Sequence, residues 1–184
     1  MTASQDKGIS STAKLSRTAM LLGAALMLSY LESFVPLPLP LPGFKLGLAN
    51  IALLVCFELV SPTAALFLQI LRISISALLF GSPATFWFSL AGGTLSYIVV
   101  AVFYAFLRKH VSELGISIAS AAMHNIGQLL AAAVIFSSAA VFAYLPWLLF
   151  ASLIFGSFTG IICRAVNKAV YEAENRRKTG IEKL

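Results

Sequence analysis

From Leu114 to Cys163 the chain runs for fifty residues without a lysine, arginine, aspartate or glutamate. About 20 helical residues cross the hydrocarbon core of a membrane, so a run of this length predicts two crossings. Small residues, aromatic residues and a proline interrupt the run between Ser137 and Pro146, which is where we expect the turn. A membrane β-barrel would need alternating polarity, and this run is apolar on every side.

Four further apolar runs precede this one, each ended by charge, glycine or proline. The chain is 59% hydrophobic and 11% charged, whereas soluble domains carry about a quarter charged residues. We therefore predict an all-α integral membrane protein, a six-transmembrane-helix bundle over residues 15–170. A flexible cytoplasmic tail (1–14) and a charged cytoplasmic tail (171–184) flank it. The predicted spans are approximately residues 15–35, 43–59, 63–80, 84–107, 116–136 and 146–170.

The distribution of cations predicts the orientation of the bundle. With both termini in the cytoplasm, Lys45 is the one cation on the outer side and Arg72 lies within a span. The other lysines and arginines then lie on the inner side, as the positive-inside rule requires. The net charge of +6 is thus a topology signal for a multi-pass protein of the cell membrane, and it does not indicate nucleic-acid binding. These inner residues are Lys7, Lys14, Arg17, Arg108, Lys109, Arg164, Lys168, Arg176, Arg177, Lys178 and Lys183.

Prolines occupy every second position from Pro36 to Pro42, so no helix can pass through this segment. Lys45 follows it, and Asn50 lies near the start of the second predicted span. One interpretation is a rigid outer lid that brings a cation and an amide to a solute site. The other is a plain loop whose lysine reaches the membrane interface.

Three polar side chains of the third predicted span share one helix face, namely Gln69, Arg72 and Ser76. Arg72 lies near the middle of the span, where exposure to lipid would cost several kcal/mol, about 2.5–3.5 on insertion scales. We therefore expect it to face the interior, against Glu32 or Glu58 or in an anion site. A structural ion pair and a binding site both stay open.

The fifth predicted span carries a second polar stripe, made of Ser117, Ser120, His124 and Gln128, with Asn125 beside it. His124, Asn125 and Gln128 fall within little more than one turn. Such clustering inside a membrane span favours a substrate pocket over an isolated core histidine. No metal site is expected, because cysteine or carboxylate companions at ligand spacing are absent from the sequence.

Small residues at helical spacing predict where helices approach closely. Two sets are expected to act within the molecule, and a third, Ala19 and Gly23, could equally contact another subunit. The two internal sets are Ser89, Gly92, Gly93 and Ser96 on the fourth span and Ser152, Gly156 and Gly160 on the sixth.

The sequence lacks the residue groups on which several enzyme classes depend. Asp6 is its one aspartate, so no carboxylate cluster can hold Mg²⁺ against a diphosphate. It has no Gly-x4-Gly-Lys-Ser/Thr loop for ATP and no set of residues for a Ser-His-Asp triad. We predict a protein that is not an enzyme and has no cofactor, and uphill transport would need energy from another protein or an ion gradient.

Four short segments carry a resemblance to a known family. They are Pro42-Gly-Phe-Lys-Leu-Gly-Leu-Ala-Asn50, Ser89-Leu-Ala-Gly-Gly93, Met123-His-Asn-Ile-Gly-Gln128 and Tyr144-Leu-Pro146. Together they resemble the heptaprenyl diphosphate synthase component I family, of the Gx transporter group. That group is similar in layout to the substrate-binding S components of energy-coupling factor (ECF) transporters.

The resemblance implies a six-helix bundle in the membrane lipid that captures a vitamin-like compound from outside. A transmembrane coupling subunit and two ATPase subunits would drive transport, and Ala19 and Gly23 would contact the coupling subunit. A small anionic or amphiphilic solute is expected, such as a flavin or a quinone or isoprenoid precursor. The residues expected to bind it are Lys45, Asn50, Gln69, Arg72, His124, Asn125 and Gln128.

Two other functions are compatible with the sequence. The chain could be a non-catalytic membrane subunit that anchors a polyprenyl diphosphate synthase or a membrane redox assembly through its C-terminal tail. It could also be a stand-alone secondary transporter, which often shows internal repeats. We find no convincing repeat between residues 15–80 and 84–170, so this third function ranks last.

Overall fold

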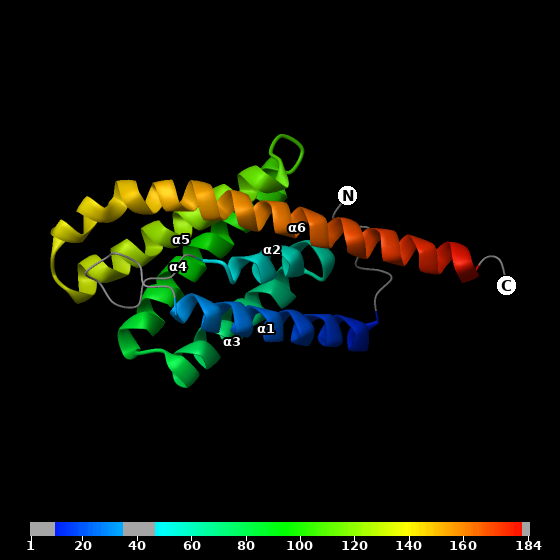
Figure 1. The fold of residues 1–184 in the computed structure, drawn as a ribbon, viewed down its shortest axis with the longest axis horizontal. Coiled ribbons are helices and arrows are strands. Elements are labelled where there is room, and N and C mark those ends of the chain that lie inside the picture. The colour runs from blue at the N-terminus through cyan, green and yellow to red at the C-terminus, as the bar shows by residue number, and fades with distance from the viewer. Residues whose placement is uncertain (1–9, 35–46, 182–184) are drawn as a thin grey trace.

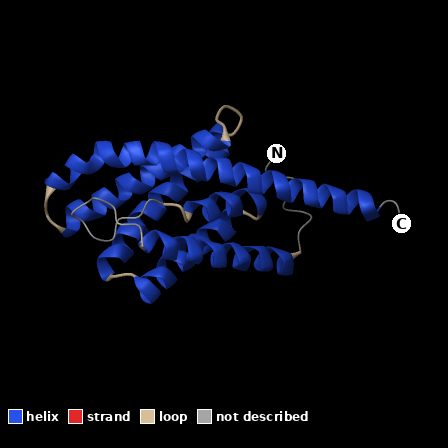
Figure 2. Cartoon of the chain, viewed as in Figure 1, coloured by secondary structure: helices blue, strands red, loops and turns tan. Residues whose placement is uncertain are grey.

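The computed structural model describes residues 10–34 and 47–181, and these residues are helical with short connections (Figures 1 and 2). The Lys45 prediction and the proline segment fall outside the described residues. The elements are α1 (Ser11–Ser33), α2 (Asn50–Leu59), α3 (Pro62–Phe80), α4 (Pro83–Val102), the π-helical η1 (Phe103–Leu107), α5 (Glu113–Ile135), the 3-10 helix η2 (Ala139–Tyr144) and α6 (Leu145–Ile181).

Serine caps define where three of the long helices begin. The hydroxyls of Ser61, Ser82 and Ser112 accept a hydrogen bond from the backbone amide three residues on, at 3.1, 3.2 and 3.2 Å. In α3 and α4 the next residue is a proline, Pro62 or Pro83, whose missing amide costs nothing at the first helical position. These dipeptides explain why the predicted boundaries of both helices agree with the structure.

Four helical segments are long and apolar enough to cross a membrane, which supports a membrane-embedded helical protein. They are Pro62–Phe80, Pro83–Leu107, Glu113–Ile135 and Ala139–Arg176. The predicted turn within the fifty-residue run is present, because α5 ends at Ile135 and the 3-10 helix η2 leads into α6. Membrane crossing by α1 and by α2 stays a prediction.

The second helix is shorter than the sequence suggested. Among the described residues, α2 has ten residues and so rises about 15 Å, half of the hydrocarbon thickness. Every residue from Asn50 to Phe57 is buried, and α2 packs against α1, α3 and α6. The short helix therefore forms the centre of the bundle, and its N-terminal end lies inside the protein.

Glycines allow α4, α5 and α6 to approach each other closely, as predicted. A methyl group on Gly92 of α4 would stand 2.6 Å from the backbone carbonyl oxygen of His124 on α5. A methyl group on Gly156 of α6 would stand 2.8 Å from the Cα atom of Ile118 on α5. Distances this short leave room for hydrogen alone, so both sets of small residues act within the molecule.

The Ala19 and Gly23 pair behaves differently. Both residues are exposed on α1, and a methyl group on Gly23 would meet nothing within 4 Å. Large apolar side chains, including Met20 and Met27, are exposed on the same helix. Among the described residues, this face of α1 is not covered by another helix.

The last helix extends well beyond the rest of the bundle (Figure 1). α6 continues to Ile181, so the described part of the predicted tail, residues 171–181, is a direct continuation of the helix. Arg17 near the start of α1 forms an ion pair with Glu174 at 2.5 Å. The beginning of α1 and the end of α6 therefore lie together at one end of the molecule. At the other end of the chain, α1 begins at Ser11, within the predicted N-terminal tail.

Candidate functional site

Buried polar side chains from α1, α2, α3 and α5 meet around the N-terminal end of α2, with two glycines of α4 beside them. We call this set the central polar cluster. Each of its side chains belongs to a residue that is at most 4% exposed, which is unusual for polar groups in an apolar helical bundle. Its members are Ser29, Glu32, Asn50, Gln69, Arg72, His124 and Gln128.

Arg72 is the cation of the cluster and is 2% exposed, as its mid-span position predicted. Its Nη1 donates to the Ser29 hydroxyl on α1 at 3.3 Å, and Glu32 is near enough to interact with its charge. The Nε and Nη2 atoms have no hydrogen-bond partner among the described residues. Of the two carboxylates that the sequence offered, Glu32 is therefore the one beside Arg72.

Glu32 also joins the cluster to the start of α2. Its Oε1 accepts a hydrogen bond from the backbone amide of Leu48 at 2.5 Å. Leu48 lies in the turn directly before α2, in which the Asn50 amide donates to the Gly47 carbonyl. The carboxylate therefore lies next to the helix N-terminus and its partial positive charge, which favours an anion. Gly47 makes the turn before the helix with φ of +83°, a conformation that favours glycine.

Asn50 and His124 adjoin each other through Gly47. A methyl group on Gly47 would stand 3.0 Å from Asn50 Nδ2 and 3.5 Å from His124 Cδ2. The helix α5 thus brings His124 to the N-terminal end of α2. Neither polar atom of the Asn50 side chain has a hydrogen-bond partner among the described residues.

Two adjacent glycines of α4 make room for the long side chains of the cluster. A methyl group on Gly92 would stand 3.0 Å from His124 Nδ1 and 3.1 Å from Gln128 Cγ. A methyl group on Gly93 would stand 2.6 Å from Gln69 Nε2. The polar side chains of α3 and α5 therefore lie directly against the bare backbone of α4.

Three buried side chains of the cluster have polar atoms without a partner among the described residues. They are Asn50 and Gln69, with both amide atoms, and Arg72, with Nε and Nη2. Buried polar atoms are normally paired, and leaving one unpaired costs about 1–3 kcal/mol. A concentration of donors and acceptors beside a buried cation is what a site for a small polar anion requires.

Five of the seven predicted binding residues therefore come together: Asn50, Gln69, Arg72, His124 and Gln128. The side chain of Asn125 points towards α6 instead, where Nδ2 donates to the Leu148 carbonyl at 3.1 Å and to the Ser152 hydroxyl at 2.8 Å. Lys45 lies outside the described residues. Within the described ranges, no group of three or more His, Cys, Asp or Glu side chains could hold a metal ion.

Sequence reasoning did not include Ser29, Gly47 and the Gly92–Gly93 pair in the site. Ser29 lies three residues before Glu32, so both share one face of α1, and this spacing was a usable signal. Gly92 and Gly93 were predicted as helix contacts. The structure shows that this close contact also accommodates His124 and Gln69.

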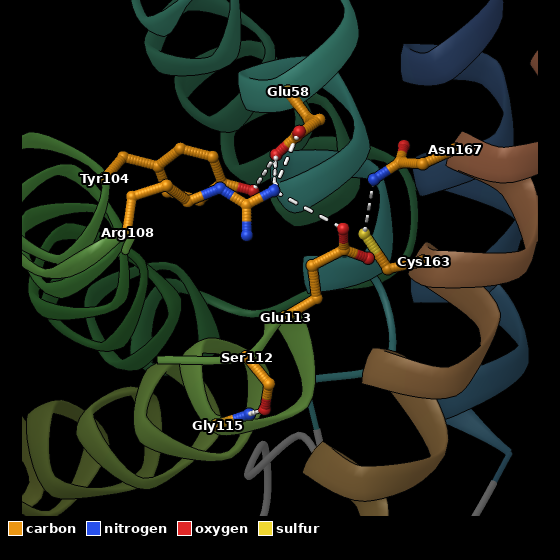
Figure 3. A network of polar contacts seen from close by, with 8 residues as sticks. All are labelled: Glu58, Tyr104, Arg108, Ser112, Glu113, Gly115, Cys163 and Asn167. Atoms are coloured by element: carbon orange, nitrogen blue, oxygen red, sulfur yellow. Dashed lines mark hydrogen bonds and ion pairs between the residues drawn. The ribbon is translucent and has the colours of Figure 1, made fainter. Parts of the chain in front are cut away.

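A second polar network lies at the opposite end of α2, about 12 Å along the helix from the first (Figure 3). Arg108 Nη2 donates to Glu58 at 2.9 and 3.0 Å and to Glu113 at 3.4 Å. The Tyr104 hydroxyl, on the π-helical turn η1, donates to the same Glu58 carboxylate. Burial lowers the pKa of Arg108, but Tyr104 and Glu58 outweigh this effect and raise it. Glu58 therefore pairs with Arg108 and not with Arg72.

An apolar groove of about 700 Å³ lies between α4 and α5. Ala91 and Gly127 line it at the point where the backbones of α4 and α5 touch, and exposed side chains such as Trp87 and Val134 form its walls. The remaining lining residues are Trp87, Leu90, Thr94, Leu95, Leu130, Ala131, Val134 and Ile135.

The family of the chain follows from a comparison with family models. The model described as heptaprenyl diphosphate synthase component I matches residues 21–166, well over half of the chain. The chain belongs to this family. The match in this component I protein runs from α1 into α6 and contains both polar networks. The family name describes one component of a synthase, which implies a protein partner for the members so named. Comparisons with curated proteins and with solved structures give no match.

Proposed function

We propose that this component I protein is the substrate-binding S component of an ECF-type importer. One observation carries the proposal, namely the central polar cluster, in which Asn50, Gln69 and Arg72 bury polar atoms that have no partner among the described residues. A cluster with a purely structural role would pair these atoms within the protein. We further propose six spans in the cell membrane, with both termini in the cytoplasm, on the distribution of cations.

The chemistry of the cluster suggests how a solute would bind. Arg72 would neutralise an acidic group, and Lys45 would add a second cation from the outer segment. The side-chain amides of Asn50, Gln69 and Gln128 and the imidazole of His124 would orient the solute through hydrogen bonds. A small vitamin-like anion, such as a flavin or a quinone or isoprenoid precursor, meets these requirements.

Transport by such a subunit would depend on other proteins. The sequence has no loop for ATP, so a transmembrane coupling subunit and two ATPase subunits would supply the energy. The exposed face of α1 around Ala19 and Gly23 is the surface we assign to the coupling subunit, because close helix contacts in membranes use small residues. On this proposal the protein itself is not catalytic.

The family name favours a second function, in which the protein anchors a polyprenyl diphosphate synthase at the membrane. The long C-terminal part of α6 would provide the surface for a soluble partner, since it extends beyond the bundle. Arg17 would help to hold this surface in place through its ion pair with Glu174.

Affinity purification of the full-length, tagged protein from its native membranes distinguishes the two functions. The importer proposal predicts that a membrane coupling subunit and two ATPase subunits co-purify. A soluble prenyl synthase recovered without ATPase subunits would contradict it and support the anchor. A chain truncated after Val170 provides the control, because the truncation should remove synthase capture and leave capture of the coupling subunit intact.

A further inference from the structure

The Glu32 carboxylate lies deep in the protein, at 4% exposure, between two positive groups of different kinds. The Leu48 amide in the turn directly before α2 donates to Oε1 at 2.5 Å, and the Arg72 guanidinium acts on the carboxylate through its charge. A carboxylate would be costly at this depth without such compensation. Both groups therefore make this a site for a negative charge.

A helix N-terminus that ends inside a membrane bundle is a recognised way to bind anions. In this protein the arrangement follows from the length of α2, whose start is buried at Ala49 (0% exposed) and Asn50 (3%). Two neighbouring side chains offer more hydrogen bonds than Glu32 uses. Both amide atoms of Asn50 and the Nε and Nη2 atoms of Arg72 have no partner among the described residues. The site is thus equipped to bind more than a single glutamate side chain.

We infer, building on the proposed function, that Glu32 occupies the position of a carboxylate group of the solute. A monocarboxylate from outside the chain takes its place against Arg72 and the start of α2, with Asn50 beside it. Glu32 lies in the last turn of α1, so its displacement needs movement at the end of one helix and not of the whole bundle.

The charge of the site selects the class of anion. The described residues contribute one full positive charge, on Arg72, and the helix N-terminus adds about half a charge. This matches a single carboxylate. A dianion such as sulfate, or a diphosphate, would carry more negative charge than these groups compensate. Lys45 lies outside the described residues and is not counted here, so on the charge of the described residues the inference selects the monocarboxylates among the anionic solutes proposed above.

Chemical rescue tests the inference with the full-length protein in detergent. The Glu32→Ala variant removes the internal carboxylate and leaves space for a small anion. Sodium acetate or formate is expected to raise its thermal unfolding temperature saturably, by about 5–10 °C near 100 times the Kd. Acetamide, which has the shape of acetate without its charge, and sodium chloride at equal ionic strength should have no such effect. The wild-type protein should respond little, because Glu32 already fills the site.

The Glu32→Ala/Arg72→Gln double variant should lose the acetate response. An equal response to acetate, acetamide and chloride would overturn the inference, and so would an acetate response that survives the Arg72 substitution. If Glu32→Ala does not stay folded in chloride, purification in acetate is the test. If folded Glu32→Ala protein is recovered in acetate and not in acetamide, the inference is supported. If the variant aggregates in all buffers, the inference is overturned. Stronger protection by sulfate than by acetate, measured relative to wild type, would overturn the monocarboxylate class.

The result is independent of the importer proposal. Acetate rescue in a protein that captures no coupling or ATPase subunits would contradict the importer function alone. An importer complex whose Glu32→Ala variant shows no rescue would contradict the role of Glu32 alone.

Discussion

The Arg72 guanidinium on α3 donates to the Ser29 hydroxyl on α1 at 3.3 Å, and both residues are buried. Ser29 and Glu32 lie three residues apart on the same face of α1, so one helix presents a hydroxyl and a carboxylate to the same cation. This relationship explains how an arginine can lie in the centre of an apolar bundle. It also locates the central polar cluster, because Glu32 connects the arginine to the start of α2.

The contact between α4 and α5 should be sensitive to a single methyl group. Gly127→Ala would bring Cβ within 2.6 Å of the Ala91 carbonyl oxygen, so the helices must separate. We expect a loss of about 1–3 kcal/mol in the free energy of unfolding, as is typical of overpacked cores. Thermal unfolding in detergent measures it. Gly23→Ala is the control, since its methyl group meets nothing within 4 Å, and equal effects of both variants would contradict the model of close packing.

Substitution of Asn125 and substitution of Asn50, the two asparagines of the predicted site, should have different effects on stability and on solute binding. Asn125→Ala removes two hydrogen bonds to α6 and should cost about 1 kcal/mol of stability. Retention of a solute should be unaffected. Asn50→Ala should have the opposite result, with a lower solute occupancy and little loss of stability. Thermal unfolding and native mass spectrometry of both variants measure this, and loss of solute from Asn125→Ala would assign Asn125 to the binding site.

The network at the far end of α2 should contribute to stability and not to solute binding. Glu58→Gln removes the charge that Arg108 contacts at 2.9 and 3.0 Å and should cost about 1–3 kcal/mol. Glu172→Gln is a matched control, because its 3.9 Å contact with Lys168 is exposed and such pairs contribute about 0–1 kcal/mol. Unfolding temperatures that fall equally for both would contradict a special role for Glu58.

The exposed face of α1 around Ala19 and Gly23 should affect capture of a coupling subunit and not the stability of the isolated protein. Ala19→Leu together with Gly23→Leu fills the space between the small residues, which should leave the unfolding temperature of the isolated protein nearly unchanged. Capture of a coupling subunit should fall severalfold, because close approach of helices is lost. Val134→Leu, an exposed position on α5, should retain full capture. Normal capture by the α1 variant would remove this surface from the proposal.

The sequence was sufficient to predict most of the long helices. Ser61-Pro62 and Ser82-Pro83 combine a cap with a residue suited to the first turn, so the starts of α3 and α4 could be predicted. The length of the fifty-residue run predicted two crossings, and the residues between Ser137 and Pro146 predicted where the turn between them lies. The start of α2 at Asn50 could not be predicted, because Leu48 and Ala49 directly before it are also apolar and composition does not show where an apolar helix begins.

The site was predictable in its residues and only partly in its arrangement. The cost of a charge in lipid directed Arg72 inward from sequence alone. Which carboxylate it approaches depends on how the helices are arranged, and here Glu32 lies beside it while Glu58 binds Arg108. Likewise His124 and Asn125 are adjacent in sequence, but successive helical residues point about 100° apart. His124 therefore faces Gly92 of α4, and Asn125 faces α6.

The most direct test of the central claim is native mass spectrometry of the full-length protein purified from its own membranes. The wild-type protein is predicted to carry a small molecule that collisional activation releases. Arg72→Ala should lose this mass while its elution volume and helix content stay unchanged, and the exposed variant Arg164→Ala should retain it. Retention of the same mass by Arg72→Ala would contradict the account, because the solute would then bind outside the central polar cluster.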